Sequence, residues 1–269
     1  MKKVFVLLVL LVVFVGVIYA ETGVKKKRPL PYEYGRVVIN NHSEKAGLAP
    51  VVFDHWVHRA NFTCRVCHVD ITFAMKAGET NIRAIDNMKG FFCGTCHDGK
   101  TAYADRKVFE ACKKQEEAGD AKQCDRCHSL DKDIKREHDF EDFKAKLPKE
   151  RFGNGINWEE AEARELIKPA NFIRGVSFKR LSFGVQKDFS LEPKVEGMPE
   201  IIFSHTKHTV WNGCEVCHPR IFRGLKKGLS KYSMIEIMEG KYCGVCHGTV
   251  AFPLLDCQRC HAKQVEMSS

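Results

Sequence analysis

The hydrophobic residues of this chain are concentrated first in one N-terminal run. An uninterrupted apolar segment from Val4 to Ile18 follows two lysines and precedes the small residue Ala20. This order is typical of a secretory signal peptide, with cleavage after Ala20. Together with Tyr19 and Ala20, the segment approaches the shortest length of a membrane-spanning helix, so an uncleaved form would act as an N-terminal anchor. In both forms we expect residues 21–269 to be exported.

Beyond this run, the clearest signal for a regular element is a single helix. Asn157 opens the capping pattern Asn-Trp-Glu-Glu, and Pro169 prevents the helix from continuing. We therefore predict a helix near 158–167. The segments Gly153–Gly155 before it and Pro193–Pro199 after it are expected to interrupt regular structure.

Composition directs attention to the cysteines. An apolar fraction of 44% argues against a disordered chain. Thirteen cysteines in 269 residues are more than an ordinary cytosolic enzyme carries and fewer than a dense disulfide scaffold needs. In an exported chain, cysteines are generally expected to form disulfides.

Twelve of the thirteen cysteines instead belong to six copies of the motif Cys-x-x-Cys-His, which is the attachment signature of c-type haem. Two thiols about one helical turn apart can bond to the two vinyl groups of one porphyrin, and the next residue can direct an imidazole at the iron. Zinc sites need no histidine directly after the second cysteine, so its presence in all six copies favours haem. The sequence predicts six covalently attached haem c groups, bound at Cys64/Cys67, Cys93/Cys96, Cys124/Cys127, Cys214/Cys217, Cys243/Cys246 and Cys257/Cys260, with proximal iron ligands His68, His97, His128, His218, His247 and His261.

The six motifs form two sets of three. Each set has the order Phe-x-His-x-x-His, first motif, Met-x-Gly, second motif, third motif, and a shift of 150 residues aligns the two sets through the second motif. The first set carries an insertion near 105–122 that the second lacks. We therefore predict a duplicated architecture. Its parts are a signal peptide or anchor at 1–20, an N-terminal arm at 21–50, triheme module A at 51–139, a linker at 140–199 and triheme module B at 200–269.

Each half resembles the cytochrome c7 triheme domain, a relative of the cytochrome c3 family of bacterial electron-transfer proteins. The paired histidines of Phe-x-His-x-x-His carry the resemblance together with the haem motifs. It covers about Val51–His128 and Ile201–Ala262 and implies a mostly α and coil fold with short β-hairpins around a haem core. It also implies that His55 and His205 are distal ligands of the first haem of each module, and His58 and His208 of the third.

The distal ligands of the two middle haems have several candidates. Met88 and Met238 each lie five residues before a second motif, and relatives with this Met-x-Gly pattern imply ligation by histidine and methionine. His42 and His138 are alternative imidazole ligands, but neither recurs in the other half. The methionines have one further interpretation, as core residues that pack on porphyrin.

The linker is expected to pack along haem faces through Phe172, Phe178, Phe183 and Phe189 rather than to hang free. Cys112, the cysteine outside the motifs, is expected to be a free or intermolecular thiol. The net charge is +9, or 9 − 2 = +7 once the two lysines of the signal are removed. Because each haem brings two propionate carboxylates, we interpret the excess lysines as counter-ions and expect no nucleic-acid partner.

These features predict an exported hexahaem electron carrier rather than an enzyme, in which the protein sets iron ligation and potential and the cofactor performs the redox chemistry. The expected partners are other cytochromes, a membrane quinol oxidoreductase or an outer-membrane conduit. The periplasm is the expected compartment, with the outer membrane or cell surface as the alternative. Two other classes are a multihaem reductase, which needs an iron with an open axial position, and a structural subunit of a filament or an outer-membrane conduit.

Overall fold

The computed structural model of the chain describes residues 28–103, 106–112, 122–129, 140–180, 187–193, 195, 197–224 and 226–262. The predicted signal peptide, His138 and part of the insertion near 105–122 lie outside these residues. The chain divides into two units, Met1–Leu30 and Pro31–Ser269, and the second contains all six Cys-x-x-Cys-His motifs.

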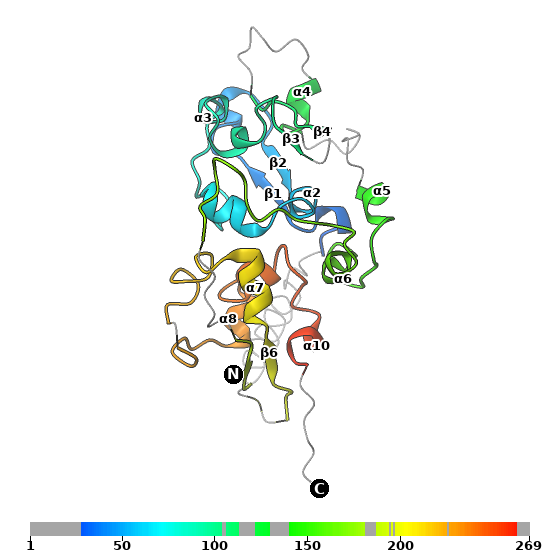
Figure 1. Cartoon of the computed structure of the whole chain (residues 1–269), viewed down its shortest axis with the longest axis vertical. Helices are drawn as coiled ribbons and strands as arrows, with labels where there is room; N and C mark the ends of the chain where they lie inside the picture. The colour runs from blue at the N-terminus through cyan, green and yellow to red at the C-terminus, as the bar shows by residue number, and fades with distance from the viewer. Residues whose placement is uncertain are drawn as a thin grey trace, which may run out of the picture. The chain divides into compact units, whose positions relative to one another are not determined.

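The described residues form short helices, turns and three two-stranded antiparallel hairpins, which confirms the predicted fold class (Figure 1). The hairpins pair β1 (Arg36–Ile39) with β2 (Val51–Asp54), β3 (Ala102–Tyr103) with β4 (Arg106–Lys107), and β5 (Phe189–Leu191) with β6 (Ile201–Phe203). The α-helices are α2 (His55–Arg59), α3 (Ala84–Met88), α4 (Lys122–Asp125), α5 (Phe140–Lys144), α6 (Trp158–Ala163), α7 (His205–Asn212), α8 (Met234–Met238), α9 (Gly244–His247) and α10 (Cys257–Cys260). Single turns of other helix types are η1 (Pro31–Glu33), η2 (Glu44–Ala46), η3 (Val66–Asp70) and η4 (Phe92–Thr95). In this part of the chain, no helix has both the length and the apolar composition needed to cross a membrane.

Modules A and B begin with the same arrangement. In each, a hairpin strand leads into the helix that carries a His-x-x-His pair, β2 into α2 and β6 into α7. The repeated residues Phe53 and Phe203 pair across their hairpins with Val37 and Phe189. The hairpin thus fixes where the histidine-bearing helix begins.

A close backbone approach joins the second motif of each module to the helix before it. A side chain at Gly94 would place its Cβ 1.9 Å from the backbone oxygen of Asn87, and one at Gly244 would meet that of Ile237 at 1.9 Å. Only glycine allows this contact. The second motif is therefore held directly against the backbone of α3 in module A and of α8 in module B.

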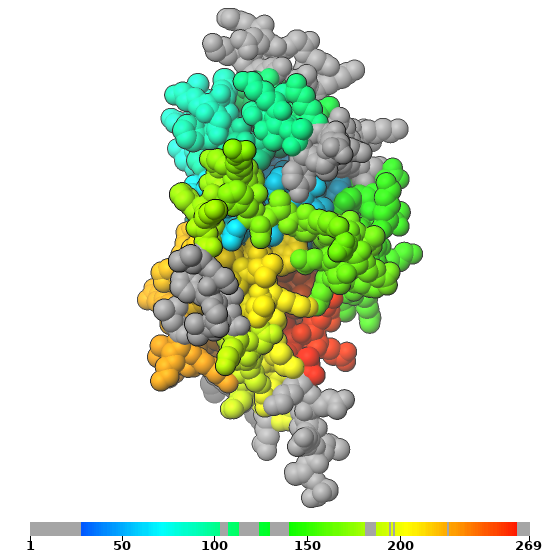
Figure 2. Space-filling model, in the orientation of Figure 1, coloured from blue at the N-terminus to red at the C-terminus, as the bar shows by residue number. Residues whose placement is uncertain are grey.

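The linker contributes most of the largest cluster of buried apolar side chains. Trp56 and Ala60 enter this cluster from α2 and its C-terminal cap. The other members all lie in the linker: Phe140, Leu147, Ile156, Trp158, Ala161 and Ile167. The linker is thus packed against α2. Figure 2 shows green residues of the linker beside blue residues of the N-terminal part of the chain on the face drawn.

The linker phenylalanines that we expected to pack on haem differ from one another in their exposure and in their contacts with the rest of the chain. Phe172 is 45% exposed and Phe178 is 70% exposed. Phe189 packs against Phe203 in the β5–β6 hairpin, and Phe183 lies outside the described residues. The linker therefore packs mainly through its earlier part, where α5 and α6 lie.

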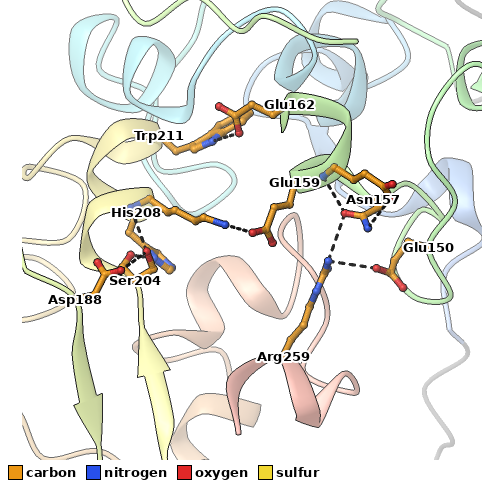
Figure 3. A network of polar contacts seen from close by, with 11 residues as sticks. Glu150, Asn157, Glu159, Glu162, Asp188, Ser204, His208, Trp211 and Arg259 are labelled. Atoms are coloured by element: carbon orange, nitrogen blue, oxygen red, sulfur yellow. Dashed lines mark hydrogen bonds and ion pairs between the residues drawn. The ribbon is translucent and has the colours of Figure 1, made fainter. Parts of the chain in front are cut away.

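Helix α6 connects the linker to module B (Figure 3). The Trp211 indole in α7 donates a hydrogen bond to Glu162 at 2.9 Å, and Lys207 forms an ion pair with Glu159. Arg259 in α10 donates to Asn157 Oδ1 at 3.4 Å. These contacts tie α6 to α7, the helix that carries His205 and His208.

Helix α6 begins as predicted and ends earlier than predicted. The Asn157 side chain accepts a hydrogen bond from the Glu160 amide, so the expected cap is present. The helix ends at Ala163, before the expected end at 167. Glu165 has φ of 55°, and the Leu166 amide bonds back to the Ala161 oxygen. This left-handed residue ends the helix before Pro169 does.

Candidate haem-binding sites

All thirteen cysteines are among the described residues, and none forms a disulfide. Within the described part of the chain, no group of three or more histidine, cysteine, aspartate or glutamate side chains is arranged to hold a metal ion. Cys112 lies outside the motifs, where its sulfur accepts a hydrogen bond from Asn87 at 3.6 Å. Each motif therefore has a pair of unbridged thiols with its own histidine.

Burial controls the ionisation of these thiols. It raises the pKa of Cys67, Cys93 and Cys246 to about 12. A thiol with such a pKa is neutral at pH 7 and is a poor spontaneous nucleophile or metal ligand. These three motif cysteines therefore lie in largely apolar surroundings, whereas Cys124, Cys214 and Cys257 are exposed.

The six motif histidines share one hydrogen-bonding pattern. In each, the ring nitrogen Nδ1 lies within hydrogen-bonding distance of a backbone oxygen. Since a carbonyl can only accept, Nδ1 donates, which leaves Nε2 with a free lone pair for a metal. The acceptors are the oxygens of Phe73 for His68 (3.0 Å), Phe109 for His97 (3.1 Å), Ala49 for His128 (2.8 Å), Phe222 for His218 (2.8 Å), Phe252 for His247 (3.1 Å) and Pro199 for His261 (2.9 Å).

Three histidines outside the motifs have the same pattern. His55 donates from Nδ1 to Gly35 at 2.6 Å, His58 to Asp54 at 3.3 Å and His208 to Ser204 at 2.8 Å. Burial lowers the pKa of His55 and His58 to about 4, so both imidazoles are neutral at pH 7. A neutral ring with a free Nε2 is the form that binds iron.

His42 differs from these histidines. It is exposed, and its Nε2 lies 2.6 Å from the side-chain oxygen of Asn81. The nitrogen that the other histidines leave free is therefore engaged in His42. His138, the other alternative ligand, lies outside the described residues.

Three pairs of histidine rings have the spacing of two imidazoles on one metal. Two such rings on opposite sides of a metal, each with a metal–nitrogen bond of about 2 Å, have centres about 6 Å apart. The ring centres lie 6.4 Å apart for His55 and His68, with the planes inclined by only 10°. The distance is 6.2 Å for His58 and His97, and 6.0 Å for His208 and His247. These residues fit a bis-histidine haem.

The pairing differs in one respect from the one that the resemblance implied. His55 lies opposite the first motif of module A, as expected. His58 and His208 lie opposite the second motif of their modules, whereas we expected them opposite the third. The hydrogen bond from Nδ1 to the residue four positions earlier orients both rings, and each stacks or tilts on the preceding phenylalanine at 4.4 to 4.5 Å.

The remaining predicted ligands have other neighbours. The His205 ring lies 5.9 Å from both Phe189 and Phe203, and the His218 ring lies 6.3 Å from Phe222. Met88 and Met238 end α3 and α8, where they are 40% and 67% exposed.

Backbone carbonyls that we did not predict orient the motif histidines. A phenylalanine follows His68, His218 and His247 by four or five positions, and in each case its carbonyl accepts the Nδ1 hydrogen bond. The recurrence of this phenylalanine after three of the six motifs was the sequence signal that could have identified these acceptors.

Six attachment motifs on a fold of short helices and hairpins define a multihaem c-type cytochrome. The chain belongs to the family of cytochrome c7 and related cytochromes c, whose model matches residues 51–129 and 201–262. These two regions coincide with the two sets of motifs, so the resemblance seen in the sequence is confirmed.

Solved structures of the same kind are similar to the chain. A c7-type three-heme cytochrome domain is 33% identical over 29% of this chain and 99% of its own length, with a TM-score of 0.26. The C-terminal hexaheme fragment of GSU1996 is 23% identical over 87% of this chain and 98% of its own, with a TM-score of 0.26. The whole dodecaheme cytochrome c GSU1996 is 22% identical over 88% of this chain and 50% of its own, with a TM-score of 0.25. None of the curated proteins compared with the chain matches it.

Proposed function

We propose that this chain carries six covalent haem c groups and transfers electrons between redox partners on the exported side of a bacterial membrane. Electron transfer is the role of its family, and c-type multihaem cytochromes of this kind are typically extracytoplasmic. The observation that supports six sites most directly is the shared Nδ1 hydrogen bond of all six motif histidines. When bound, haem supplies reversible one-electron exchange at its iron.

The chain's own residues hold and orient these groups. The twelve motif cysteines attach them, and the motif histidines are the proximal ligands. We assign His55 and His205 as distal ligands of the first haem of each module, and His58 and His208 of the second. The ring spacings of 6.4, 6.2 and 6.0 Å support three of these four assignments.

With histidines as distal ligands of the first and second haems, only the third haem of each module still needs a distal ligand, and the methionines are the remaining candidates. With His58 and His208 beside the second motifs, Met88 and Met238 are proposed as distal ligands for the haems of His128 and His261. Besides burial, the nearby Cys127 raises the pKa of Cys93 and the nearby Cys260 raises that of Cys243, which supports a short distance between second and third motifs. This assignment replaces our expectation that the methionines cap the middle haems.

A carrier differs from a reductase in the coordination of its irons. The proposed set gives every iron two protein ligands and leaves no position for a substrate. Partner cytochromes, a membrane quinol oxidoreductase or an outer-membrane conduit are the proposed donors and acceptors, and the periplasm is the proposed compartment.

Carbon monoxide tests the proposal, because it binds ferrous haem only at an open axial position. The fully reduced wild-type protein, matured in a haem-attaching host, should retain its absorption spectrum under carbon monoxide and should reduce an oxidised small cytochrome c. The variant His208→Ala, which opens one position, should bind the gas at one haem and serves as the positive control. Carbon monoxide binding by the wild type would instead favour a reductase.

A further inference from the structure

Arg59 occupies the place where residues of both modules and the linker meet. It is the last residue of α2, next to His58. Its Nη1 donates a hydrogen bond to the Val250 oxygen of module B at 2.8 Å. Its guanidinium carbon lies 4.6 Å from the ring centre of Trp158 in α6 and 5.6 Å from that of Trp211 in α7. Figure 3 shows Trp211 at this junction, beside Glu162 of α6.

In the part of the chain that the structure describes, no ion pair neutralises the charge of Arg59. Two other arginines that join segments of the chain contact carboxylates: Arg180 contacts Asp70 at 2.9 Å, and Arg259 contacts Glu150 at 3.3 Å. Among the described residues, no carboxylate lies within ion-pair distance of Arg59. Glu162 interacts with it only at longer range, and one Glu162 oxygen accepts the Trp211 indole N–H. Arginine stays protonated even where burial lowers its pKa, so a fixed positive charge remains here.

Two haem sites face this charge. His55 lies one helical turn before Arg59 in α2. On the other side, the Val250 amide bonds to the oxygen of Cys246, so Arg59 contacts the turn that follows the second motif of module B. A side chain at Gly35 would meet both His55 and Val250, at 3.4 and 3.5 Å, which places these two sites side by side.

The duplication shows that this charge is not a requirement of the repeat. The residue 150 positions after Arg59 is Thr209, whose hydroxyl bonds to the His205 oxygen at 2.7 Å. Both residues occupy the same place after a His-x-x-His pair. Only the one at the junction is charged.

We propose that Arg59 tunes the midpoint potentials of the two haems at the junction, the first of module A and the second of module B. A fixed cation in a medium of low dielectric constant favours the ferrous form, which carries one positive charge less, and so raises the potential. The inference rests on the proposed function, which places haem on both motifs.

Potentiometric titration of the full holoprotein, followed haem by haem by NMR, tests whether Arg59 raises these two midpoint potentials. Arg59→Met, which removes the charge and keeps most of the length, should shift the midpoint potentials of these two haems downward and leave the other four nearly unchanged. Arg59→Lys should restore most of the shift. Glu162→Gln, which keeps an acceptor for the Trp211 indole and removes a negative charge, should shift the same two potentials upward.

Arg164→Gln is the matched control, because it removes a positive charge from an α6 side chain that is 64% exposed. A shift in Arg59→Met no larger than in Arg164→Gln would overturn the inference. So would equal shifts in Arg59→Met and Arg59→Lys, which indicate loss of packing. If Arg59→Met fails to assemble with haem, Glu162→Gln decides the question instead. Unchanged midpoint potentials in that variant would overturn the inference. A wild-type protein without haem on these motifs would refute the proposed function instead.

Discussion

A hydrogen bond at Nδ1 distinguishes nine of the eleven described histidines from His42. Nine described histidines direct Nδ1 to a backbone oxygen, whereas His42 engages Nε2 with a side chain. A backbone acceptor fixes both the tautomer and the orientation of the ring. For His128 and His261 the acceptor lies 79 and 62 residues away along the chain, so the orientation of these two rings could not be read from the spacing of histidines in the sequence.

His58→Met tests the revised pairing at a single residue. A thioether stabilises ferrous iron relative to imidazole, so the affected haem should have a higher midpoint potential. We expect this rise in the haem attached at Cys93 and Cys96, followed by NMR during redox titration. His42→Met, the control, should change no haem. A rise confined to the haem at Cys124 and Cys127 would contradict the pairing.

Tyr34→Phe tests a hydrogen bond between the N-terminal arm and module B. The Tyr34 hydroxyl donates to the Ala251 oxygen at 2.5 Å, and burial raises its pKa from 10.0 to about 12. Between these values the unfolded chain loses the phenolic proton and the folded chain keeps it, so stability should fall as the pH rises from 10 to 12. The variant should be about 1 kcal/mol less stable at pH 7.

Tyr34→Phe should also lose less stability than the wild type across this alkaline window, because it lacks the ionising group. Thermal unfolding at a series of pH values checks both effects. Identical pH profiles for the two proteins would show that Tyr34 ionisation does not contribute.

At the scale of helices and strands, local sequence signals predicted where a helix begins more accurately than which other segments it contacts. The Asn157 cap is present, and both His-x-x-His pairs lie on helices. The second-motif partners that we propose for His58 and His208 differ from the third motifs that we expected, because these pairings depend on the path of the chain between motifs rather than on local spacing. The early end of α6 depends on the left-handed Glu165, for which no glycine signalled a stop.

Asn157→Ala tests the role of α6 as the element that joins the linker to module B. The change removes the cap and the acceptor of the Arg259 guanidinium. Loss of the cap alone should reduce stability by about 1 kcal/mol. We expect a lower Tm of the holoprotein in thermal unfolding. Asn171→Ala, at an exposed asparagine, is the control and should leave the Tm unchanged. Equal Tm values for both variants would argue against this role.

The whole molecule has little apolar core of its own. Among the described residues only twelve apolar side chains are buried, and eight of them form the cluster around Trp56. A chain of this size normally buries far more, so bound cofactor should supply much of the folding free energy.

We therefore expect the chain to fold cooperatively only when its haems are attached. Protein matured in a haem-attaching host should have the mass of residues 21–269 plus six haems. The same chain produced without haem attachment should show little cooperative unfolding by circular dichroism. A mass with five or fewer haems at full maturation would contradict the two-module proposal, and cooperative unfolding without haem would contradict the role of cofactor in folding.

The position of Trp56 also limits how this protein can be divided for study. Trp56 is only 4% exposed, and apart from Ala60 its buried partners all come from residues 140–167. A fragment cut at the end of the first repeat would retain all three of its haem motifs yet expose this indole to water. A fragment extended to about residue 167 would keep the indole covered. The unit that was duplicated and the unit that keeps Trp56 covered therefore have different boundaries.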